Sequence, residues 1–226
     1  MLRAGSGMNK PLQDKLTPEN ALIFRITHRS NIPWILENGL HCGTSTVQDP
    51  NFINIGNPEI IERRTRRVVE IAPGGSLAEY VPFYFTPFSP MLYNIKTGWG
   101  GIQKRNNDEI VVIVSSLLAL EQHGVTYVYT DRHAYLKAAR FCSDRSQLAD
   151  YVDFPLLQRK DFRADPDDPG KKERYQAEAL AHRFVPVGAI RGVCCYTSSV
   201  QGELLRACSD LAAEIRVFVR ADWYFP

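Results

Sequence analysis

The stretch EIVVIVSS, residues 109–116, places five consecutive β-branched apolar residues between a glutamate and two serines. Short runs of this kind are typical of a buried strand at the centre of a sheet. The following LLALEQHG predicts a short helix that Gly124 ends, and VTYVYT at 125–130 predicts a second strand. The middle of the chain therefore indicates a sheet built around residues 109–116.

The segments before and after this strand alternate irregularly between strand and helix patterns. Strands are predicted at 22–27, at the start of 79–95, at 190–197 and at 214–225, and helices at 31–38, from 57 onward, at 201–210 and, in two pieces, at 133–152. This order favours an α+β fold with a mixed or mostly antiparallel sheet. The segment QAEALAHRFV at 176–185 fits a helix by its composition and a strand by its short length and flanking prolines, so both remain open.

Capping residues and prolines mark where several elements begin and end. Ser30 is a candidate cap for the helix at 31–38, which Gly39 can end. The strand that opens EYVPFYFTPFSPMLYNI, residues 79–95, contains prolines, which donate no backbone hydrogen bond. We therefore expect this strand to be bent or at an edge of the sheet. Ser89 then predicts a short capped helix.

A long polar loop and an arginine-rich helix follow one another near the N-terminal third of the chain. Residues 41–56 have no regular pattern, and loops of this length inside compact domains are more often functional than not. Asn57 and Pro58 then give a helix start in NPEIIERRTRRVVE, residues 57–70. Four of five successive positions in it are arginines: Arg63, Arg64, Arg66 and Arg67. A charge run is most often a solvated helix face, so its function has to be decided by the rest of the chain.

Composition limits the class of protein. The 226 residues are 44% hydrophobic and carry a net charge of only +2, which provides a sizeable core and excludes a histone-like neutraliser of nucleic acid. No run approaches the ~18 apolar residues of a membrane span, and the N-terminus lacks an apolar signal segment. We expect a cytoplasmic protein without membrane contact. We expect residues 1–10 to be a flexible extension and residues 11–226 to form a single domain.

Several common site motifs are absent. There is no glycine-rich dinucleotide turn after a strand, no phosphate-binding P-loop, no HExxH and no GxSxG. The five cysteines lack CxxC spacing, which argues against a disulfide framework and a zinc site, and we expect them to be reduced and buried. Any nucleotide chemistry must therefore use another fold, without a metal.

Two short constellations place reactive side chains at the ends of predicted strands. Thr27 and His28 end the first strand, although a lone histidine there is more often structural. Asp131, Arg132 and His133 bring an acid, a cation and a base together just after the strand at 125–130. A turn capped by the aspartate explains part of this pattern without a function.

A carboxylate in an apolar segment is a third candidate. Glu178 lies in the otherwise apolar part of ERYQAEAL, residues 173–180. A buried carboxylate has to be paired, hydrogen-bonded or used, because an unpaired buried charge costs several kcal/mol. Glu178 is therefore a better functional candidate than Glu173, which we expect to be exposed.

Taken in order, five segments resemble one known family. IFRITHRSNIPWILENGL, GNPEIIERRTRR, YVPFYFTPFSPMLYNI, VTYVYTDRHA and KKERYQAEAL are similar to segments of the DarT-type DNA ADP-ribosyltransferase toxins. The resemblance runs from about residue 22 to the terminal DWYF. It implies an ADP-ribosyltransferase-like fold, with a split mixed or antiparallel β-sheet core, surrounding helices, and an extended pocket for NAD.

The resemblance also implies an activity and partners. Members of the family transfer ADP-ribose from NAD, their co-substrate, to a base of single-stranded DNA, thymine in one branch and guanine in another. A macrodomain-type or related antitoxin reverses the modification. The alternatives that we keep open are a transferase acting on RNA or protein and a catalytically silent nucleic-acid-binding module of the same fold.

By the same resemblance, individual residues receive roles. Glu178 and Arg64 take the places of the catalytic glutamate and arginine, and His133 that of a histidine near the acceptor base. NAD contacts are expected from Arg25, Thr27, His28, Arg64, Tyr84, Ser89, Met91 and Tyr93, and DNA contacts from Arg63, Arg67, Arg132 and His133. The chain departs from the family pattern at Arg25, where the family often has a histidine, so the details of NAD binding are open at this position.

Overall fold

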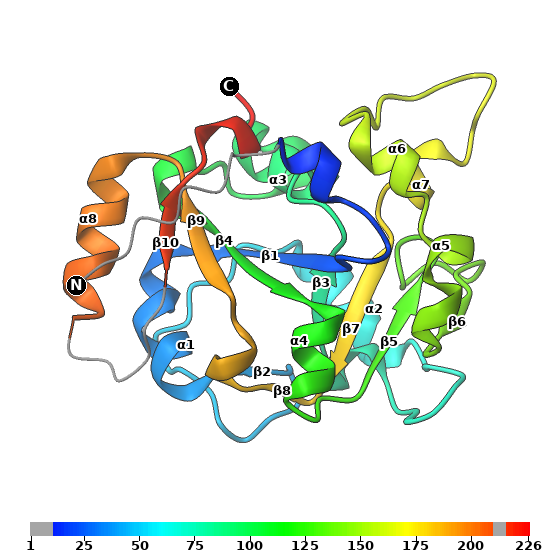
Figure 1. The fold of residues 1–226 in the computed structure, drawn as a ribbon, viewed down its shortest axis with the longest axis horizontal. Coiled ribbons are helices and arrows are strands. Elements are labelled where there is room, and N and C mark those ends of the chain that lie inside the picture. Colours follow the sequence, from blue (N-terminus) through cyan, green and yellow to red (C-terminus); the bar gives the residue numbers. More distant parts are fainter. Residues whose placement is uncertain (1–10, 210–215) are drawn as a thin grey trace.

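The computed structural model describes residues 11–209 and 216–226 (Figure 1). The predicted flexible extension, residues 1–10, lies outside the described residues. The described strands are β1 (Leu22–His28), β2 (Leu40–His41), β3 (Tyr80–Tyr84), β4 (Ile110–Ser116), β5 (Tyr127–Thr130), β6 (Phe141–Cys142), β7 (Glu178–His182), β8 (Phe184–Val185), β9 (Gly192–Cys195) and β10 (Val217–Val219). The described α-helices are α1 (Ile32–Asn38), α2 (Pro58–Arg66), α3 (Pro90–Thr97), α4 (Leu117–Gln122), α5 (Leu148–Tyr151), α6 (Phe154–Gln158), α7 (Lys171–Arg174) and α8 (Ser198–Ala207).

Eight strands form one sheet in the order β10-β9-β4-β1-β3-β7-β5-β6, while β2 and β8 form a small separate pair. Every pairing in the large sheet is antiparallel except that of β9 with β10. In Figure 1, α8 lies beside β10 at one side of the molecule, and α5 lies at the other side near β5 and β6, with α6 and α7 above it. The expected α+β fold with a mostly antiparallel sheet is confirmed.

The β-branched run forms a central strand, as predicted. Strand β4 lies between β1 and β9, and its residues from Ile110 to Ile113 are completely or almost completely buried. It pairs with β1 along all seven residues of both strands, from Leu22 with Ser116 to His28 with Ile110. This long register fixes β1, which carries two of the predicted site residues.

The sheet opens between β1 and β3. These strands share only the pair Phe24 and Tyr84, whereas β3 pairs with β7 along five residues. Past Phe24, β1 follows β4 and leaves β3, and the side chain of Arg25 enters the gap and donates to the carbonyl oxygen of Pro82 at 3.0 Å. This gap is the split of the sheet that the family resemblance implies.

Of the two alternatives expected for β3, a bent strand or an edge strand, the edge position is wrong, because β3 lies inside the sheet between β1 and β7. The carbonyl of Pro82 points toward the gap, and the N–H and C=O of a strand residue point the same way. Pro82 therefore lacks its N–H on the side that faces β1, where the strands make no backbone hydrogen bond. A proline inside a sheet is tolerated here because the sheet is split beside it.

Most predicted helices are present, with small shifts at their ends. Asn57 caps α2 by accepting from the backbone N–H groups of Glu59 and Ile60, and Ser89 caps α3. Helix α1 begins slightly later than expected: the side chain of His28, rather than Ser30, accepts at the start of the 3-10 turn that precedes it. His28 therefore caps the 3-10 turn at Arg29–Asn31 that leads into α1.

Three segments differ from the sequence expectation. The segment 176–185, left open, is extended and forms β7 and β8, because its residues fill the place beside β3. Residues 133–140, predicted helical, form turns, and only α5 and a preceding 3-10 turn are helical in 133–152. The last strand is only three residues long, with a 3-10 turn at 221–223, and residues 210–215 lie outside the described residues.

The cysteines are buried, as predicted, with one exception. Cys42, Cys142, Cys194 and Cys195 are buried, whereas Cys208 at the end of α8 is only partly buried. Within residues 11–209 and 216–226, no helix has the length and hydropathy needed to cross a membrane.

The turn at Gly39 gives a test of the fold. Gly39 has a φ of 82°, and a Cβ there would lie 2.6 Å from the ring of Phe184 and from the carbonyl oxygen of Val185. We expect Gly39→Ala to lower the free energy of unfolding by about 2 kcal/mol or more, measured by urea denaturation, because it combines backbone strain with a collision. Gly124→Ala is the matched control, since Gly124 has a φ of 67° but a Cβ there would meet nothing within 4 Å. Equal losses for the two variants would show that the β2–β8 contact imposes no restraint.

Candidate active site

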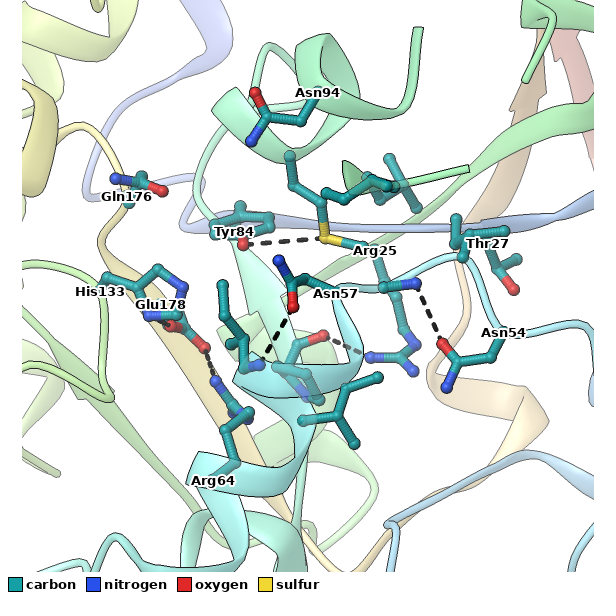
Figure 2. A pocket seen from close by; sticks show the side chains of 18 of the residues that line it. Arg25, Thr27, Asn54, Asn57, Arg64, Tyr84, Asn94, His133, Gln176 and Glu178 are labelled. Carbon is teal, nitrogen blue, oxygen red and sulfur yellow. Dashed lines mark hydrogen bonds and ion pairs between the residues drawn. The ribbon is translucent and has the colours of Figure 1, made fainter. Parts of the chain in front are cut away.

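A buried carboxylate is the centre of the site. Glu178, the first residue of β7, is 1% exposed. Its Oε2 accepts from Arg64 Nη1 at 2.9 Å, and its Oε1 lies 2.9 Å from His133 Nδ1 and accepts from the backbone N–H of Ala134 at 2.9 Å. Figure 2 shows the side chains of Arg64 and His133 directed toward Glu178 from two different segments. The three residues predicted to be catalytic are therefore brought together.

The strand next to β7 positions the histidine. Thr130, at the end of β5, accepts a hydrogen bond from the backbone N–H of Glu178 at 3.1 Å, and its hydroxyl lies 2.6 Å from the carbonyl oxygen of Arg132, to which it donates. One threonine thus ties the start of β7 to the turn that carries His133 and Ala134. The order of residues after β5 places both groups within reach of the carboxylate.

Helix α2 positions the arginine. Its start is fixed by the Asn57 cap, and Arg64 lies two turns later, with its side chain 12% exposed. Neither Arg63 nor Arg66 points the same way, since both side chains are mostly exposed and pair with glutamates one turn earlier on the helix. Arg64 is therefore the arginine of α2 that contributes to the buried cluster. Arg63 and Arg66 are solvated, as the residues of a charge run usually are.

The electrostatics of the cluster keep Glu178 ionised. Burial by itself raises the pKa of this carboxyl, but the positive charge of Arg64, the contact with His133 and the N–H of Ala134 outweigh it, so that the pKa lies well below its usual value. A carboxylate that is fixed in its charged form, inside a pocket, can stabilise a positive charge that develops on a bound molecule.

The cluster lies at one end of a cavity of about 1050 Å³ that is open to solvent and fills the split between β1 and β3. Of the residues predicted to contact NAD, five line it: Arg25, Thr27, Arg64, Tyr84 and Met91. Tyr84 and Met91 are neighbours, with the hydroxyl 4.0 Å from the sulfur. The strand end and the start of α3 thus contribute to a single pocket.

Three further residues predicted to contact NAD lie outside the lining. His28 is buried at the far end of β1, where it caps the next turn and approaches Glu109. Ser89 is buried and caps α3. Tyr93 is on the outer side of the same helix and packs against aromatic rings. The capping role of Ser89 was predicted from the sequence, whereas the partners of His28 and Tyr93 were not.

Two arginines predicted to bind DNA have partners within the chain. Arg132 lies 3.3 Å from Asp131 and 3.2 Å from Glu173. Arg67 is mostly buried, pairs with Glu70 and lies over the ring of Phe141. A DNA phosphate would have to compete with these carboxylates for both guanidinium groups.

Sequence reasoning missed part of the pocket wall. The lining also includes Phe52, Asn54, Asn57, Asn94, Trp99 and Gln176. The unusual length of the loop at 41–56 was the signal for the first two of these residues. Trp99 lies in GWGGI, a stretch whose glycines suit a turn, while Asn94 and Gln176 have no distinguishing sequence context.

Three buried nitrogen atoms of described pocket residues make no hydrogen bond: Nε of Arg25, Nη2 of Arg64 and Nδ1 of His133, the last of which lies 2.9 Å from Glu178 Oε1. Unsatisfied buried donors are rare in native proteins and call for an explanation, such as a ligand. Among residues 11–209 and 216–226, no group of three or more histidine, cysteine, aspartate or glutamate side chains is placed to hold a metal ion. The pocket is built to receive an acceptor-bearing molecule.

Comparison with known proteins adds independent information. The family described as "ssDNA thymidine ADP-ribosyltransferase, DarT" matches residues 24–225. The chain is 51% identical over 210 residues to a protein named DNA ADP-ribosyl transferase from Escherichia coli O127:H6, with 93% of this chain and 96% of that protein covered. A protein of the same name from Thermus sp. strain 2.9 is 37% identical over 210 residues, with 92% of this chain and 98% of that protein covered.

Solved structures agree with the sequence comparison. Thermus sp. 2.9 DarT in complex with ADP-ribosylated single-stranded DNA matches with a TM-score of 0.83 and 34% identity, over 92% of this chain and 98% of that chain. The same protein in complex with NAD+ matches with a TM-score of 0.79 and 32% identity, over 92% of this chain and 99% of that chain.

The charge state of Glu178 gives a prediction for stability. Because its pKa is lower in the folded protein than its ordinary value of 4.5, Glu178 stabilises the fold above about pH 4.5, and this contribution is lost as the pH falls through the folded-state pKa. We expect Glu178→Gln to lower the free energy of unfolding by about 3 kcal/mol at pH 7, since it leaves Arg64 without its counterion. The difference from wild type should shrink below pH 4.5.

Urea unfolding at pH 7 and at pH 3 checks this expectation. Glu62→Gln is the matched control, because Glu62 forms an exposed ion pair with Arg66 and its loss should change stability by at most about 1 kcal/mol. A Glu178→Gln penalty that is the same at both pH values would show that packing, rather than charge, is what the glutamate contributes.

Proposed function

The chain belongs to the DarT family of single-stranded DNA thymidine ADP-ribosyltransferases, and from this we propose that it transfers ADP-ribose from NAD to thymine in single-stranded DNA. It is an NAD-dependent DNA ADP-ribosyltransferase. The observation that supports the reaction best is the buried, ionised Glu178 held between Arg64 and His133 at the end of an open pocket.

The pocket fits NAD in its chemistry. Its walls combine aromatic and aliphatic side chains with two arginines that have unpaired buried N–H groups. When bound, NAD supplies a ribose whose bond to nicotinamide breaks readily. Tyr84 on β3 lies directly opposite Glu178 on β7, and its aromatic side chain lines this end of the pocket.

Glu178 is proposed to be the catalytic carboxylate. Loss of nicotinamide leaves positive charge on the ribose, and an ionised carboxylate beside the ribose lowers the energy of that state. Arg64 holds one oxygen of Glu178, and the N–H of Ala134 holds the other. The carboxylate is therefore preorganised and does not have to move or lose solvent during the reaction.

His133 is proposed to act on the acceptor base. Its ring contacts Glu178 and stands edge-on to Tyr135, with ring centroids 4.9 Å apart, on the turn after β5. When the base forms a bond to the ribose carbon, a proton must leave the base, and a neutral imidazole nitrogen can accept it. Unpaired bases need no extraction from a duplex, which agrees with single strands as substrate.

The choice of base remains a proposal. The matching family is described by thymidine, whereas the family resemblance of the sequence allowed guanine as well. We also propose, as expected from the sequence, that residues 11–226 act as one domain in the cytoplasm. The DNA contacts of Arg63, Arg67 and Arg132 stay predictions.

The expected protein partner is an antitoxin that reverses the DNA modification. A relative from Thermosipho africanus is a fusion of a DNA ADP-ribosyl transferase with a DNA ADP-ribosyl glycohydrolase, and the match covers 46% of that protein at 22% identity. The present chain is similar to the transferase part. A glycohydrolase that removes the ADP-ribose mark is the partner of this transferase.

One experiment tests the activity and the acceptor together. The protein is incubated with adenine-labelled NAD and with single-stranded DNA oligonucleotides that differ only in whether thymine is present, and the nucleosides are analysed by mass spectrometry. We expect ADP-ribose on thymidine and release of nicotinamide in equal amount. Duplex DNA should be modified far more slowly, because opening a base pair costs a few kcal/mol.

Glu178→Gln is the matched control for this experiment, since it keeps the shape of the side chain. It should lower the rate at least ~10²-fold, the usual effect of removing one preorganised electrostatic group. If the label is found on guanosine, guanine and not thymine is the acceptor. If the label is found on RNA or on protein, DNA is not the substrate. A protein that modifies none of these would be a silent binding module.

The role of His133 has its own test. We expect His133→Ala to reduce DNA modification about 10²-fold while NAD affinity, measured by calorimetry, changes less than about threefold, because the histidine acts on the acceptor. His123→Ala is the control, since His123 is exposed at the end of α4. If NAD affinity falls in step with DNA modification, His133 belongs to the NAD-binding part of the pocket instead.

A further inference from the structure

Arg132 connects the turn after β5 to α7. Its Nη1 donates to Glu173 Oε2 on α7 at 3.2 Å. His133 follows Arg132 in the chain and Gln176 follows α7, and both of these residues line the pocket. Figure 2 shows them at the end of the pocket where Glu178 lies. The ion pair between Arg132 and Glu173 therefore adjoins the place where the proposed acceptor base has to enter.

A second carboxylate holds the guanidinium of Arg132 in place. The Nε and Nη2 atoms of Arg132 each lie 3.3 Å from an oxygen of Asp131. Asp131 is 3% exposed, and it accepts from the backbone N–H of Arg140 at 3.0 Å and from the Nε of Arg140 at 2.9 Å. The direction of the Arg132 side chain is thus set within the turn after β5, and Glu173 is not needed to hold it there.

Helix α7 is likewise fixed by other contacts. Lys171, its first residue, contacts Asp161 at 2.9 Å. Arg174, its last residue, contacts Asp168 at 2.7 Å. Because these two ion pairs lie on both sides of Glu173 in the chain, the helix keeps its place when the Glu173 carboxylate loses its partner.

The pair between Arg132 and Glu173 can be exchanged for another one. The two side chains are 25% and 46% exposed, and ion pairs with this much solvent contact contribute little to stability. A stronger acceptor that reaches Nη1 of Arg132 can therefore displace Glu173. A phosphodiester is such an acceptor, since hydrogen bonds between guanidinium and phosphate are charge-assisted and suit the planar shape of arginine.

We propose that Arg132 binds one phosphate of the acceptor DNA strand, and that Glu173 occupies this phosphate site as an internal competitor until DNA displaces it. The inference rests on the proposed function and deepens it by naming a contact of the strand beside the pocket. Displacement keeps the charges balanced, because Arg140 stays paired with Asp131 while the phosphate replaces the carboxylate at Arg132. Glu173 then remains on α7, where water solvates its charge.

The two members of this ion pair consequently have opposite effects on DNA binding. Arg132 attracts the strand, whereas Glu173 occupies the guanidinium and repels the phosphates. An ion pair that only fastened α7 to the turn after β5 would behave differently, because loss of either partner would loosen the same contact. The direction of the change in DNA affinity therefore separates a phosphate site from a structural link.

The experiment measures binding of a fluorescent single-stranded oligonucleotide with one thymine, by anisotropy without NAD, and the KM of the same oligonucleotide in the transfer reaction. We expect Glu173→Gln to bind it about fivefold more tightly and Arg132→Gln about tenfold more weakly. In the double variant the gain from Glu173→Gln should vanish, since the guanidinium that it frees is gone. Calorimetry should show unchanged NAD affinity in all three variants, because neither side chain lines the pocket.

Glu203→Gln is the matched control for the change in net charge. Glu203 pairs with Arg29 at 3.0 Å, and its side chain is 46% exposed, as that of Glu173 is. It lies on α8, which Figure 1 shows at the other side of the molecule from α7. We expect this variant to bind the oligonucleotide as the wild type does.

A second measurement locates the phosphate. Oligonucleotides in which one phosphate at a time is replaced by a neutral methylphosphonate are compared in wild type and in Glu173→Gln. At one linkage near the thymine, the replacement should weaken binding and abolish the gain from Glu173→Gln. This series does not use Arg132→Gln, so it gives the answer even if thermal unfolding shows that Arg132→Gln is not folded.

The outcomes distinguish this inference from the proposed function. If Glu173→Gln weakens DNA binding, or binds DNA no more tightly than Glu203→Gln does, the ion pair is a structural link and the inference is wrong. A gain that persists in the double variant, or with a methylphosphonate at every linkage in turn, overturns the phosphate site as well. If the wild-type protein transfers no ADP-ribose to single-stranded DNA, the proposed function itself fails.

Discussion

The ion pair between Arg64 and Glu178 is the contact on which the site depends. It joins residues that are 114 positions apart, and it is made inside the protein, where neither charge is well solvated. Each charge is costly without the other, so the pair fixes α2 over the end of β7. The same pairing holds the carboxylate in its ionised form and at a defined orientation. A single contact thus links the stability of the fold to the readiness of the site.

The split of the sheet is the second structural condition. A continuous sheet would pair β1 with β3 and would leave no cavity between them. Here β4 holds β1 along its whole length and β7 holds β3, while β1 and β3 share one residue pair. The strands are therefore rigid although they separate. Side chains from both edges of the gap, such as Arg25 and Tyr84, become the walls of the pocket. Rigid supports on both sides suit a reaction in which catalysis depends on fixed charges.

The site consequently draws on segments from most of the chain: β1, the polar loop before α2, α2 itself, the end of β3, the turn after β5 and the start of β7. This division assigns different tasks to different segments. In the proposed function, the strand edges and α2 provide charge and an apolar wall for NAD, and the turn after β5 provides the histidine that is proposed to act on the acceptor base. Thr130 connects the two parts, because it bonds to both the backbone of Glu178 and that of Arg132.

The sequence by itself determined the elements whose signals are local. The β-branched run of β4, the Asn57 cap of α2 and the Ser89 cap of α3 act within a few residues, and each was predicted correctly. A glutamate in an apolar segment also identified Glu178 before any fold was known. The family resemblance had indicated Arg64 among the four arginines. Only the tertiary structure decided that Arg64 reaches that glutamate, that 176–185 is extended, and that a proline strand lies inside the sheet. These outcomes depend on which strands pair over long separations, and pairing is set by the packing of the whole chain rather than by any one segment.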